Sequence, residues 1–169
     1  NKVYADAKNN IICTKTLLES VKGKKIHFTF ISTDKAVEPK TVLGITKRIG
    51  ELLVHYVSNN NDYKKCKFTI VRFGNVIGSD GSALPYFINQ IKKDQSISVT
   101  DKKMQRYFMT IKEACELVLQ STLINSKNKI LFLDMGEPIK IVHIIKKIFD
   151  ICKQPNQKLK LKYIGNKFN

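Results

Sequence analysis

Four consecutive residues could carry chemistry together: Ser32, Thr33, Asp34 and Lys35. They close an apolar, β-branched run at residues 26–32 that predicts a strand. Ligands bind at the carboxyl ends of strands in open α/β sheets, so these residues would lie at the mouth of a crevice. A hydroxyl, a carboxylate and an amine can there hold an alkoxide, donate a proton and accept one. Taken alone, the residues also suit a polar turn in which Asp34 is a cap.

The segment that follows adds two further candidates. Its spacing predicts a helix over 41–58 whose apolar face carries Val42, Ile45, Ile49, Leu52, Leu53 and Tyr56. Leu43 and Lys47 share another face, one turn apart, although Lys47 alone also suits a solvated lysine. Gly44 and Gly50 each cost roughly 1 kcal/mol against Ala inside a helix. Their presence predicts that a strand or a ligand closely approaches the helix backbone.

Helices and strands alternate along the chain. Further helices are expected at 5–21, 84–93, 110–124 and 138–152, and further strands at 67–72, 96–99, 130–134 and 159–164. Thr110 and Glu113 have the T-x-x-E spacing of a capping box. The alternation predicts an α/β fold. Residues 1–74 would form part of a Rossmann-type, doubly wound parallel sheet that needs further strands upstream, and residues 75–169 a smaller α+β lobe.

Composition narrows the class of protein. Of the 169 residues, 43% are hydrophobic and 26% charged, which fits a globular protein and excludes a disordered one. No apolar run reaches the roughly 20 residues of a membrane span, and the first residues lack the apolar core of a signal peptide. The cysteines and histidines are scattered, so we expect reduced thiols, a cytoplasmic location and no metal site. The cysteines are Cys13, Cys66, Cys115 and Cys152.

The net charge of +16 would suit a protein that binds nucleic acid. Only three basic residues are arginines, Arg48, Arg72 and Arg106, and the lysines are spread along the whole chain. A specific nucleic-acid reader would use arginine forks on bases and phosphates. We therefore expect no specific nucleic-acid partner, while a basic binding module without catalysis stays open as an alternative.

Four segments resemble one enzyme family: STDKAVEPKTVLGITKR (32–48), VRFGNVIGSDGSALPYFINQI (71–91), QRYFMTIKEACELVLQ (105–120) and FLDMGEPIKI (132–141). The family is that of the nucleotide-sugar 4,6-dehydratases of polysaccharide biosynthesis, in the extended short-chain dehydrogenase/reductase superfamily. The UDP-N-acetylglucosamine 4,6-dehydratases look most similar. The segments occur in order and with matching gaps over nearly the whole chain.

The resemblance implies a reaction and roles for its residues. A bound NAD or NADP would take a hydride from sugar C4, water would leave across C5 and C6, and the hydride would return to C6. Thr33 would contact the C4 oxygen, Asp34 would protonate the leaving C6 hydroxyl, and Lys35 would remove the C5 proton. Lys47 would hold the nicotinamide ribose. Ser32 and Leu43 would also lie against the cofactor.

The resemblance also implies a UDP-sugar substrate. Asn75 matches a substrate-contacting asparagine, although it also suits a turn after a strand. Ser82, Pro85 and Gln90 match the region that closes over the uridine, and Arg106 matches the arginine that grips the pyrophosphate. The family often builds homo-oligomers. Its long members reach the membrane only through N-terminal helices, which this sequence lacks.

Two departures from the family pattern leave alternatives open. Leu43 stands where the superfamily has its catalytic tyrosine, so Thr33 with Asp34, or a water, is left as the base for C4 oxidation. The Gly-rich phosphate loop T-G-x-x-G-x-x-G is missing, which implies a catalytic-domain fragment that is inactive alone. An epimerase or reductase of the same superfamily stays open, although Leu43 argues against an epimerase. A degenerate, inactive relative is also open, although the intact Thr33-Asp34-Lys35 argues against it.

Overall fold

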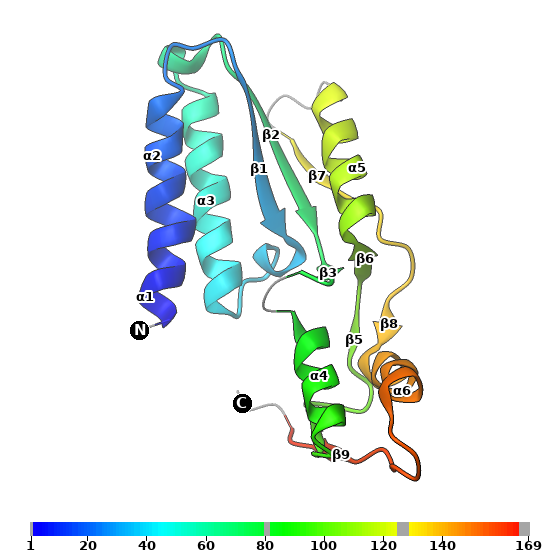
Figure 1. The fold of residues 1–169 in the computed structure, drawn as a ribbon. Helices are drawn as coiled ribbons and strands as arrows, with labels where there is room; N and C mark the ends of the chain where they lie inside the picture. The colour runs from blue at the N-terminus through cyan, green and yellow to red at the C-terminus, as the bar shows by residue number, and fades with distance from the viewer. Residues whose placement is uncertain (1, 80–81, 125–128, 166–169) are drawn as a thin grey trace. The chain divides into compact units, whose positions relative to one another are not determined.

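The computed structural model describes residues 2–79, 82–124 and 129–165. It divides into two compact units (Figure 1): unit 1 comprises residues 1–74 and 114–134, and unit 2 comprises residues 75–113 and 135–169. The chain first passes from unit 1 to unit 2 after Gly74. Residues 114–134, which the sequence prediction assigned to the second lobe, instead fold with unit 1 because they supply a strand to its sheet.

Unit 1 is built on a parallel sheet of three strands in the order β1-β2-β7. Strand β1 (His27–Thr33) pairs along its full length with β2 (Lys67–Phe73), and Thr33 is opposite Phe73. Strand β7 (Ile130–Phe132) pairs with the other edge of β2. The central position of β2 explains why its Val71 is fully buried. The expected strand at 130–134 is thus two residues shorter and belongs to this sheet.

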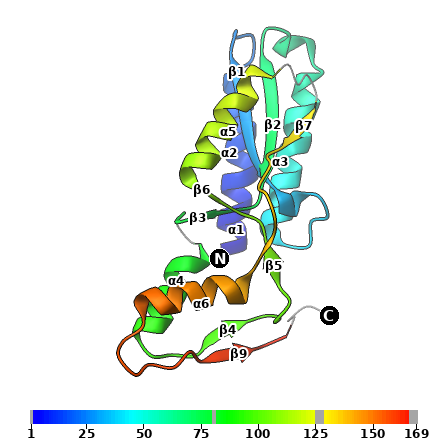
Figure 2. The same cartoon turned by 90° about the vertical axis from the view of Figure 1, so that its right-hand side faces the viewer.

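Helices lie on both sides of this sheet (Figures 1 and 2). One side carries α3 (Val42–Ser58) beside a continuous helical segment made of α1 (Lys2–Ala7), a π-helical turn (Lys8–Ile12) and α2 (Cys13–Ser20). The other side carries α5 (Ile111–Leu123). Leu18, Phe30, Val54 and Ile70 form the core between helices and strands. The predicted α/β class, with helices covering parallel strands, is confirmed.

The buried face of α3 is not the apolar face that its sequence predicts. Its buried residues are Gly44, Thr46, Gly50, Glu51 and Val54. Of the predicted apolar face, Val42, Ile45, Leu52 and Tyr56 are exposed, and Ile49 and Leu53 are half-buried. Two of the buried residues are glycines because a side chain at Gly44 would meet the Lys35 carbonyl oxygen and one at Gly50 would meet the Phe30 ring.

Unit 2 contains short strands packed with two helices. Its core joins Phe87, Ile91, Ile97, Val99 and Ile145 with further residues of α4 and α6. The two helices are α4 (Ala83–Lys92) and α6 (Ile141–Cys152). Two pairs of strands are parallel: β3 (Asn75–Ile77) with β6 (Phe108–Thr110), and β4 (Ile97–Val99) with β9 (Leu161–Tyr163). The third pair, β5 (Gln105–Arg106) with β8 (Ile139–Lys140), is antiparallel.

Two helix starts show where sequence patterns held and where they did not. The capping box is confirmed: Thr110 N donates to Glu113 Oε2 at 2.7 Å, and Glu113 N donates to Thr110 Oγ1 at 3.2 Å. The helix expected from Pro138 begins only at Ile141, because Ile139 pairs with Arg106 between β8 and β5.

Among the residues that the structure describes, no helix has both the length and the apolar character that crossing a membrane requires. Among the same residues, no three His, Cys, Asp or Glu side chains gather closely enough to hold a metal ion.

Candidate active site

The Thr33-Asp34-Lys35 group lies where β1 ends and a single 3-10 turn, η2 (Asp34–Ala36), begins. The Thr33 hydroxyl donates to Asp34 Oδ1 at 2.9 Å, and the Lys35 ammonium donates to the same oxygen at 2.9 Å. Thr33 is buried, and the side chains of Asp34 and Lys35 are about one-quarter exposed. The group is therefore a continuous path of hydrogen bonds from a hydroxyl through a carboxylate to an ammonium, and it remains within reach of solvent.

The first turn of helix α3 packs against η2. Thr41 caps the helix by accepting a hydrogen bond from Gly44 N at 3.1 Å. A methyl group at Gly44 would lie 2.3 Å from the Lys35 carbonyl oxygen, and one at Gly50 would lie 2.4 Å from the Phe30 ring. The predicted close approach at both glycines is thus confirmed, and at Gly44 the neighbour is the backbone of a candidate catalytic residue.

Lys47 lies one turn further along α3 and reaches the same strand. Its ammonium donates to the Ile31 carbonyl at 3.0 Å and lies 5.2 Å from the centre of the Phe30 ring. Burial lowers the pKa of Lys47. Leu43 lies one turn before it and is 42% exposed. Lys47 therefore belongs to the surroundings of Thr33 rather than to a solvated helix face.

A buried ionic cluster that the sequence analysis missed lies beneath this group. Glu51 is 1% exposed and is bonded to residues of β1 and β2. Its Oε1 accepts from Ser32 Oγ at 2.5 Å and from Arg72 Nε at 2.6 Å, and its Oε2 accepts from Arg72 Nη2 at 2.5 Å and from Arg48 Nη1 at 3.0 Å. The Ser32 hydroxyl, expected against the cofactor, is thus bonded to Glu51.

The hydrogen bonds keep Glu51 ionised. Burial raises the pKa of its carboxyl, but the hydrogen bonds from Arg72, Ser32 and Arg48 outweigh burial and leave the pKa below its ordinary value. A sequence signal for the cluster did exist. Glu51 follows Lys47 by one turn on a helix, and Arg72 interrupts an apolar strand. A charge in a strand that reads as buried needs a partner, but the predicted apolar face of the helix does not include Glu51, so the sequence alone does not identify Glu51 as that partner.

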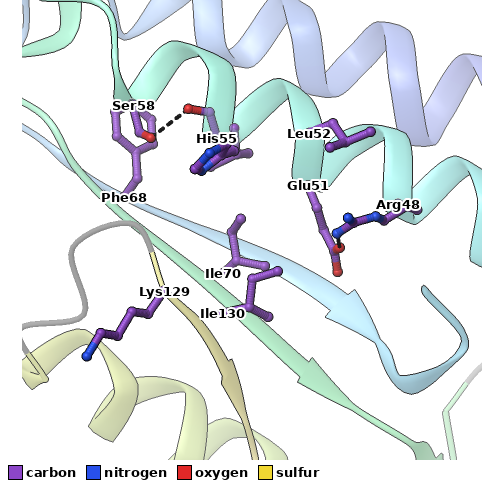
Figure 3. Close-up of a pocket in the computed structure, with 10 residues that line it drawn as sticks. Arg48, Glu51, Leu52, His55, Ser58, Phe68, Ile70, Lys129 and Ile130 are labelled. Carbon is purple, nitrogen blue, oxygen red and sulfur yellow. Dashed lines mark hydrogen bonds and ion pairs between the residues drawn. The ribbon is translucent and has the colours of Figure 1, made fainter. Parts of the chain in front are cut away.

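A cavity of about 230 Å³ in unit 1 lies between α3 and the strands β2 and β7 (Figure 3). The Glu51 and Arg48 side chains meet at one side of it, and Ile70 and Ile130 lie beside them. None of the predicted site residues lines this cavity. It borders the Glu51 cluster through Glu51 and Arg48.

Unit 2 carries the residues expected to bind substrate. Asn75 begins β3, and its N–H donates to the Tyr107 carbonyl at 3.0 Å, one residue after Arg106. Arg106 is exposed, and its guanidinium donates to the Gln105 carbonyl at 2.8 Å. Within the described ranges, no carboxylate pairs with Arg106. Strand pairing thus brings Asn75 close to Arg106, whose guanidinium is open to an anion.

The remaining candidates lie on α4. Ser82 is the residue before its first turn, Pro85 is exposed in that turn, and Gln90 is buried more than one turn later. Among the described residues, Ser82 Oγ and Gln90 Oε1 are buried side-chain oxygens with no hydrogen-bond partner. The Gln90 amide nitrogen donates to Tyr86 Oη at 3.0 Å and to the Ser96 carbonyl at 3.3 Å. Gln90 therefore lies five residues after Pro85 and eight residues after Ser82 along α4.

Comparison with known proteins now decides the family. The family described as "Polysaccharide biosynthesis protein" matches residues 1–168. The chain belongs to this family. It is 44% identical over 159 residues to the capsular polysaccharide biosynthesis protein CapD of Staphylococcus aureus, covering 94% of this chain and 26% of CapD. The polysaccharide-biosynthesis family expected from the four sequence segments is thus confirmed.

Solved structures share the fold. Pen from Bacillus thuringiensis superimposes with a TM-score of 0.82 at 31% identity, covering 94% of this chain and 48% of Pen. UDP-glucuronic acid 4-epimerase from Bacillus cereus, solved with UDP-glucuronic acid and NAD, gives a TM-score of 0.77 at 22% identity, covering 94% of this chain and 55% of the epimerase. The chain spans between about a quarter and about a half of the length of these proteins. Its fold is that of Rossmann-type nucleotide-sugar enzymes, as predicted.

Proposed function

We propose that the full-length protein is an NAD(P)-dependent nucleotide-sugar 4,6-dehydratase. Its substrate would be UDP-N-acetylglucosamine and its product a UDP-4-keto-6-deoxy sugar for surface polysaccharide or glycan. The observation that carries the proposal is the hydrogen-bonded path from Thr33 through Asp34 to Lys35 at the carboxyl end of β1. The dehydratase resemblance of residues 32–48 and membership of a polysaccharide-biosynthesis family support it.

The residues around the end of β1 suit a nicotinamide nucleotide. When bound, the cofactor accepts a hydride from sugar C4 and returns it to C6. Lys47 supplies an ammonium beside this end of the strand, and an ammonium is a suitable donor to ribose hydroxyls. The lowered pKa of Lys47 also eases loss of its proton. A fold neighbour solved with both NAD and a UDP-sugar supports this assignment.

The three residues can account for every proton of the dehydration. As C4 is oxidised, its hydroxyl proton passes through the Thr33 hydroxyl to Asp34, which already accepts a hydrogen bond from Thr33. Asp34 then gives a proton to the C6 hydroxyl, which leaves as water. As Asp34 protonates the C6 hydroxyl, the Lys35 ammonium passes its own proton to Asp34 along their hydrogen bond, and the resulting amine takes the C5 proton, made acidic by the neighbouring C4 ketone. When C6 is reduced, Lys35 gives that proton back to C5 and recovers its own from Asp34. The C4 oxidation thus needs no tyrosine.

The position of Leu43 favours this route over epimerisation. Lys47 has the place of the superfamily lysine, but one turn before it the side chain is aliphatic and cannot move a proton. Epimerases of the superfamily usually keep a tyrosine at that place as the base for C4. Here Thr33 and Asp34 would supply the base instead, and the Asp34 carboxylate would also be available for the water loss, which an epimerase does not perform.

For the substrate, we assign Arg106 to the UDP pyrophosphate, because its guanidinium is exposed and meets no carboxylate among the described residues. Asn75, close to it along the paired strands, is assigned to the sugar. Ser82 and Pro85 are assigned to the uridine. Gln90 has an unsatisfied amide oxygen, but it lies near the far end of α4 and is the weakest of these assignments.

The cellular setting follows from the proposed chemistry. Nucleotide sugars and dinucleotides are cytoplasmic metabolites, and the four cysteines are free thiols. We therefore assign the reaction to the cytoplasm.

The test is to incubate the full-length protein with UDP-N-acetylglucosamine and follow the sugar nucleotide by mass spectrometry. The proposal predicts loss of one water and a 4-keto signal by NMR. The variant Asp34→Asn should lose the activity, whereas Asp62→Asn, which removes an exposed carboxylate paired with Lys22, should keep it. Unchanged product mass with an inverted C4 centre would identify an epimerase, and no reaction by the folded, cofactor-loaded protein would reject this substrate.

A further inference from the structure

The buried carboxylate of Glu51 joins three elements at one level of the sheet. Ser32 and Arg72 are directly opposite each other in the β1–β2 register, and each is one residue before the end of its strand. Glu51, on α3, bonds to both of them through the same oxygen. The cluster thus ties the carboxyl ends of β1 and β2 to the helix, at the residue that precedes Thr33.

Three successive turns of α3 each contact a different residue at or just after the end of β1. The first turn, at Gly44, touches the Lys35 carbonyl, the next, at Lys47, bonds to the Ile31 carbonyl, and the third, at Glu51, bonds to the Ser32 hydroxyl. Adjacent residues of a strand point to opposite faces, so fixing the Ser32 side chain against α3 directs Thr33 to the other face. The Ser32–Glu51 bond thus anchors the residue directly before Thr33.

Stability alone is a weak reason for such a cluster. Removing two charges from water costs energy that their attraction rarely exceeds, and well-packed apolar residues stabilise a core as well or better. A buried ion pair does, however, define one geometry, because the guanidinium fork of Arg72 meets both oxygens of Glu51. The cluster lies at the carboxyl ends of β1 and β2, next to Thr33, where the positions of the candidate catalytic groups are set.

We infer that Glu51 is a positioning residue, which acts through Ser32 and Arg72 to hold Thr33, Asp34 and Lys35 in their reactive arrangement. This inference rests on the proposed function for its catalytic consequence, but its structural consequence can be measured without any activity. Glu51 is only 1% exposed, and its carboxylate oxygens are bonded to Ser32, Arg72 and Arg48. Loss of the Glu51 charge should release the end of β1 while leaving the beginning of the strand paired with β2.

The experiment compares Glu51→Gln with Val54→Ala in the full-length protein. Val54 is a buried core residue one turn further along α3, so its truncation destabilises the same helix without touching Ser32 or Arg72. Ser32→Ala is the milder variant: it removes one hydrogen bond, keeps the Glu51–Arg72 pair and guards against failure of Glu51→Gln to fold.

Amide hydrogen exchange gives the readout that does not depend on turnover. At matched overall stability, Glu51→Gln and Ser32→Ala should raise exchange at residues 32–36 by about tenfold over Val54→Ala, with little difference at residues 27–30. Equal exchange at residues 32–36 in all three variants would overturn the inference, because the cluster would then be merely structural.

Kinetics gives the second readout. Glu51→Gln should lower kcat by about 100-fold with KM changed less than about threefold, because a misplaced catalytic group affects the transition state more than binding. Val54→Ala should keep kcat per folded molecule. Wild-type kcat in both Glu51→Gln and Ser32→Ala would also overturn the inference. If the wild-type protein does not convert the UDP-sugar, the proposed function fails, and hydrogen exchange alone decides the role of Glu51.

Discussion

Replacing Gly44 with alanine puts a methyl group 2.3 Å from the Lys35 carbonyl oxygen, a backbone atom that cannot turn away as a flexible side chain can. Gly50→Ala is a matched control in the same helix. Its methyl group would lie 2.4 Å from the Phe30 ring, which is a side chain of the core. Both substitutions replace a helical glycine and both create a close contact, but only Gly44→Ala pushes directly on the candidate active site.

The magnitudes can be worked from these contacts. Restoring an ordinary van der Waals separation requires the Lys35 carbonyl to move by about 1 Å. Overpacking costs about 1–3 kcal/mol, and the gain in helix propensity from Gly to Ala offsets about 1 kcal/mol of it, so both variants should lose at most about 2 kcal/mol of stability. A 1 Å displacement of a catalytic group can lower turnover by about 100-fold, or about 2.7 kcal/mol in the barrier.

The assay is turnover of UDP-N-acetylglucosamine by the full-length variants, measured beside the free energy of unfolding in urea. We expect similar stability losses in the two variants, a kcat about 100-fold lower in Gly44→Ala, and a kcat within about threefold of the wild type in Gly50→Ala. A Gly44→Ala variant with wild-type kcat would refute the reasoning, since Lys35 could then move by about 1 Å without consequence.

Three further predictions follow from the same geometry. Thr33→Val, which keeps the shape of the side chain but removes the hydroxyl, should slow substrate-dependent reduction of the bound cofactor by at least about 100-fold. Thr33→Ser, which keeps the hydroxyl, should retain most of the wild-type rate. Stopped-flow absorbance of the reduced cofactor measures both rates. Arg106→Ala should raise KM for the UDP-sugar with cofactor affinity unchanged in titration calorimetry; equal losses of both affinities would reject its assignment to the pyrophosphate. The lowered pKa of Glu51 means that its carboxylate stabilises the fold above its ordinary pKa and that this contribution is lost as pH falls through the lowered value. The stability difference between wild type and Glu51→Gln should therefore be largest near neutral pH and shrink in acid, and a pH-independent difference in denaturant unfolding would contradict the assigned ion pair.

Local patterns of the sequence predict most of the elements and the place of the Thr33-Asp34-Lys35 group. An apolar run that ends in polar residues marks the carboxyl end of a strand, and the T-x-x-E spacing at Thr110 marks a helix start, because both depend on residues near in sequence. The glycine interruptions of α3 correctly indicate a close neighbour. They do not reveal that the neighbour at Gly44 is the backbone of Lys35, only nine residues away in sequence.

Features that depend on distant pairing were not predicted. The buried face of α3 was misread because most of its apolar stripe is exposed, with only Ile49 and Leu53 half-buried, and hydrophobic periodicity alone does not say which face meets the sheet. The Glu51–Arg72 pair joins residues 21 positions apart, on elements whose packing is not visible in either segment. Residues 114–134, which include β7, were assigned to the second lobe because the chain enters unit 2 at residue 75 and returns to unit 1 only at residue 114.

The central claim is that Lys35 removes the C5 proton after C4 has been oxidised, and a single-turnover comparison of Lys35→Ala with Lys40→Ala tests it most directly. Lys40 is an exposed lysine five residues further along and serves as the control. With UDP-N-acetylglucosamine and the full-length protein, the account predicts that Lys35→Ala accumulates the absorbance of reduced nicotinamide without loss of water from the sugar, while Lys40→Ala completes the reaction as the wild type does. Loss of water from the sugar at the wild-type rate in Lys35→Ala would contradict the account.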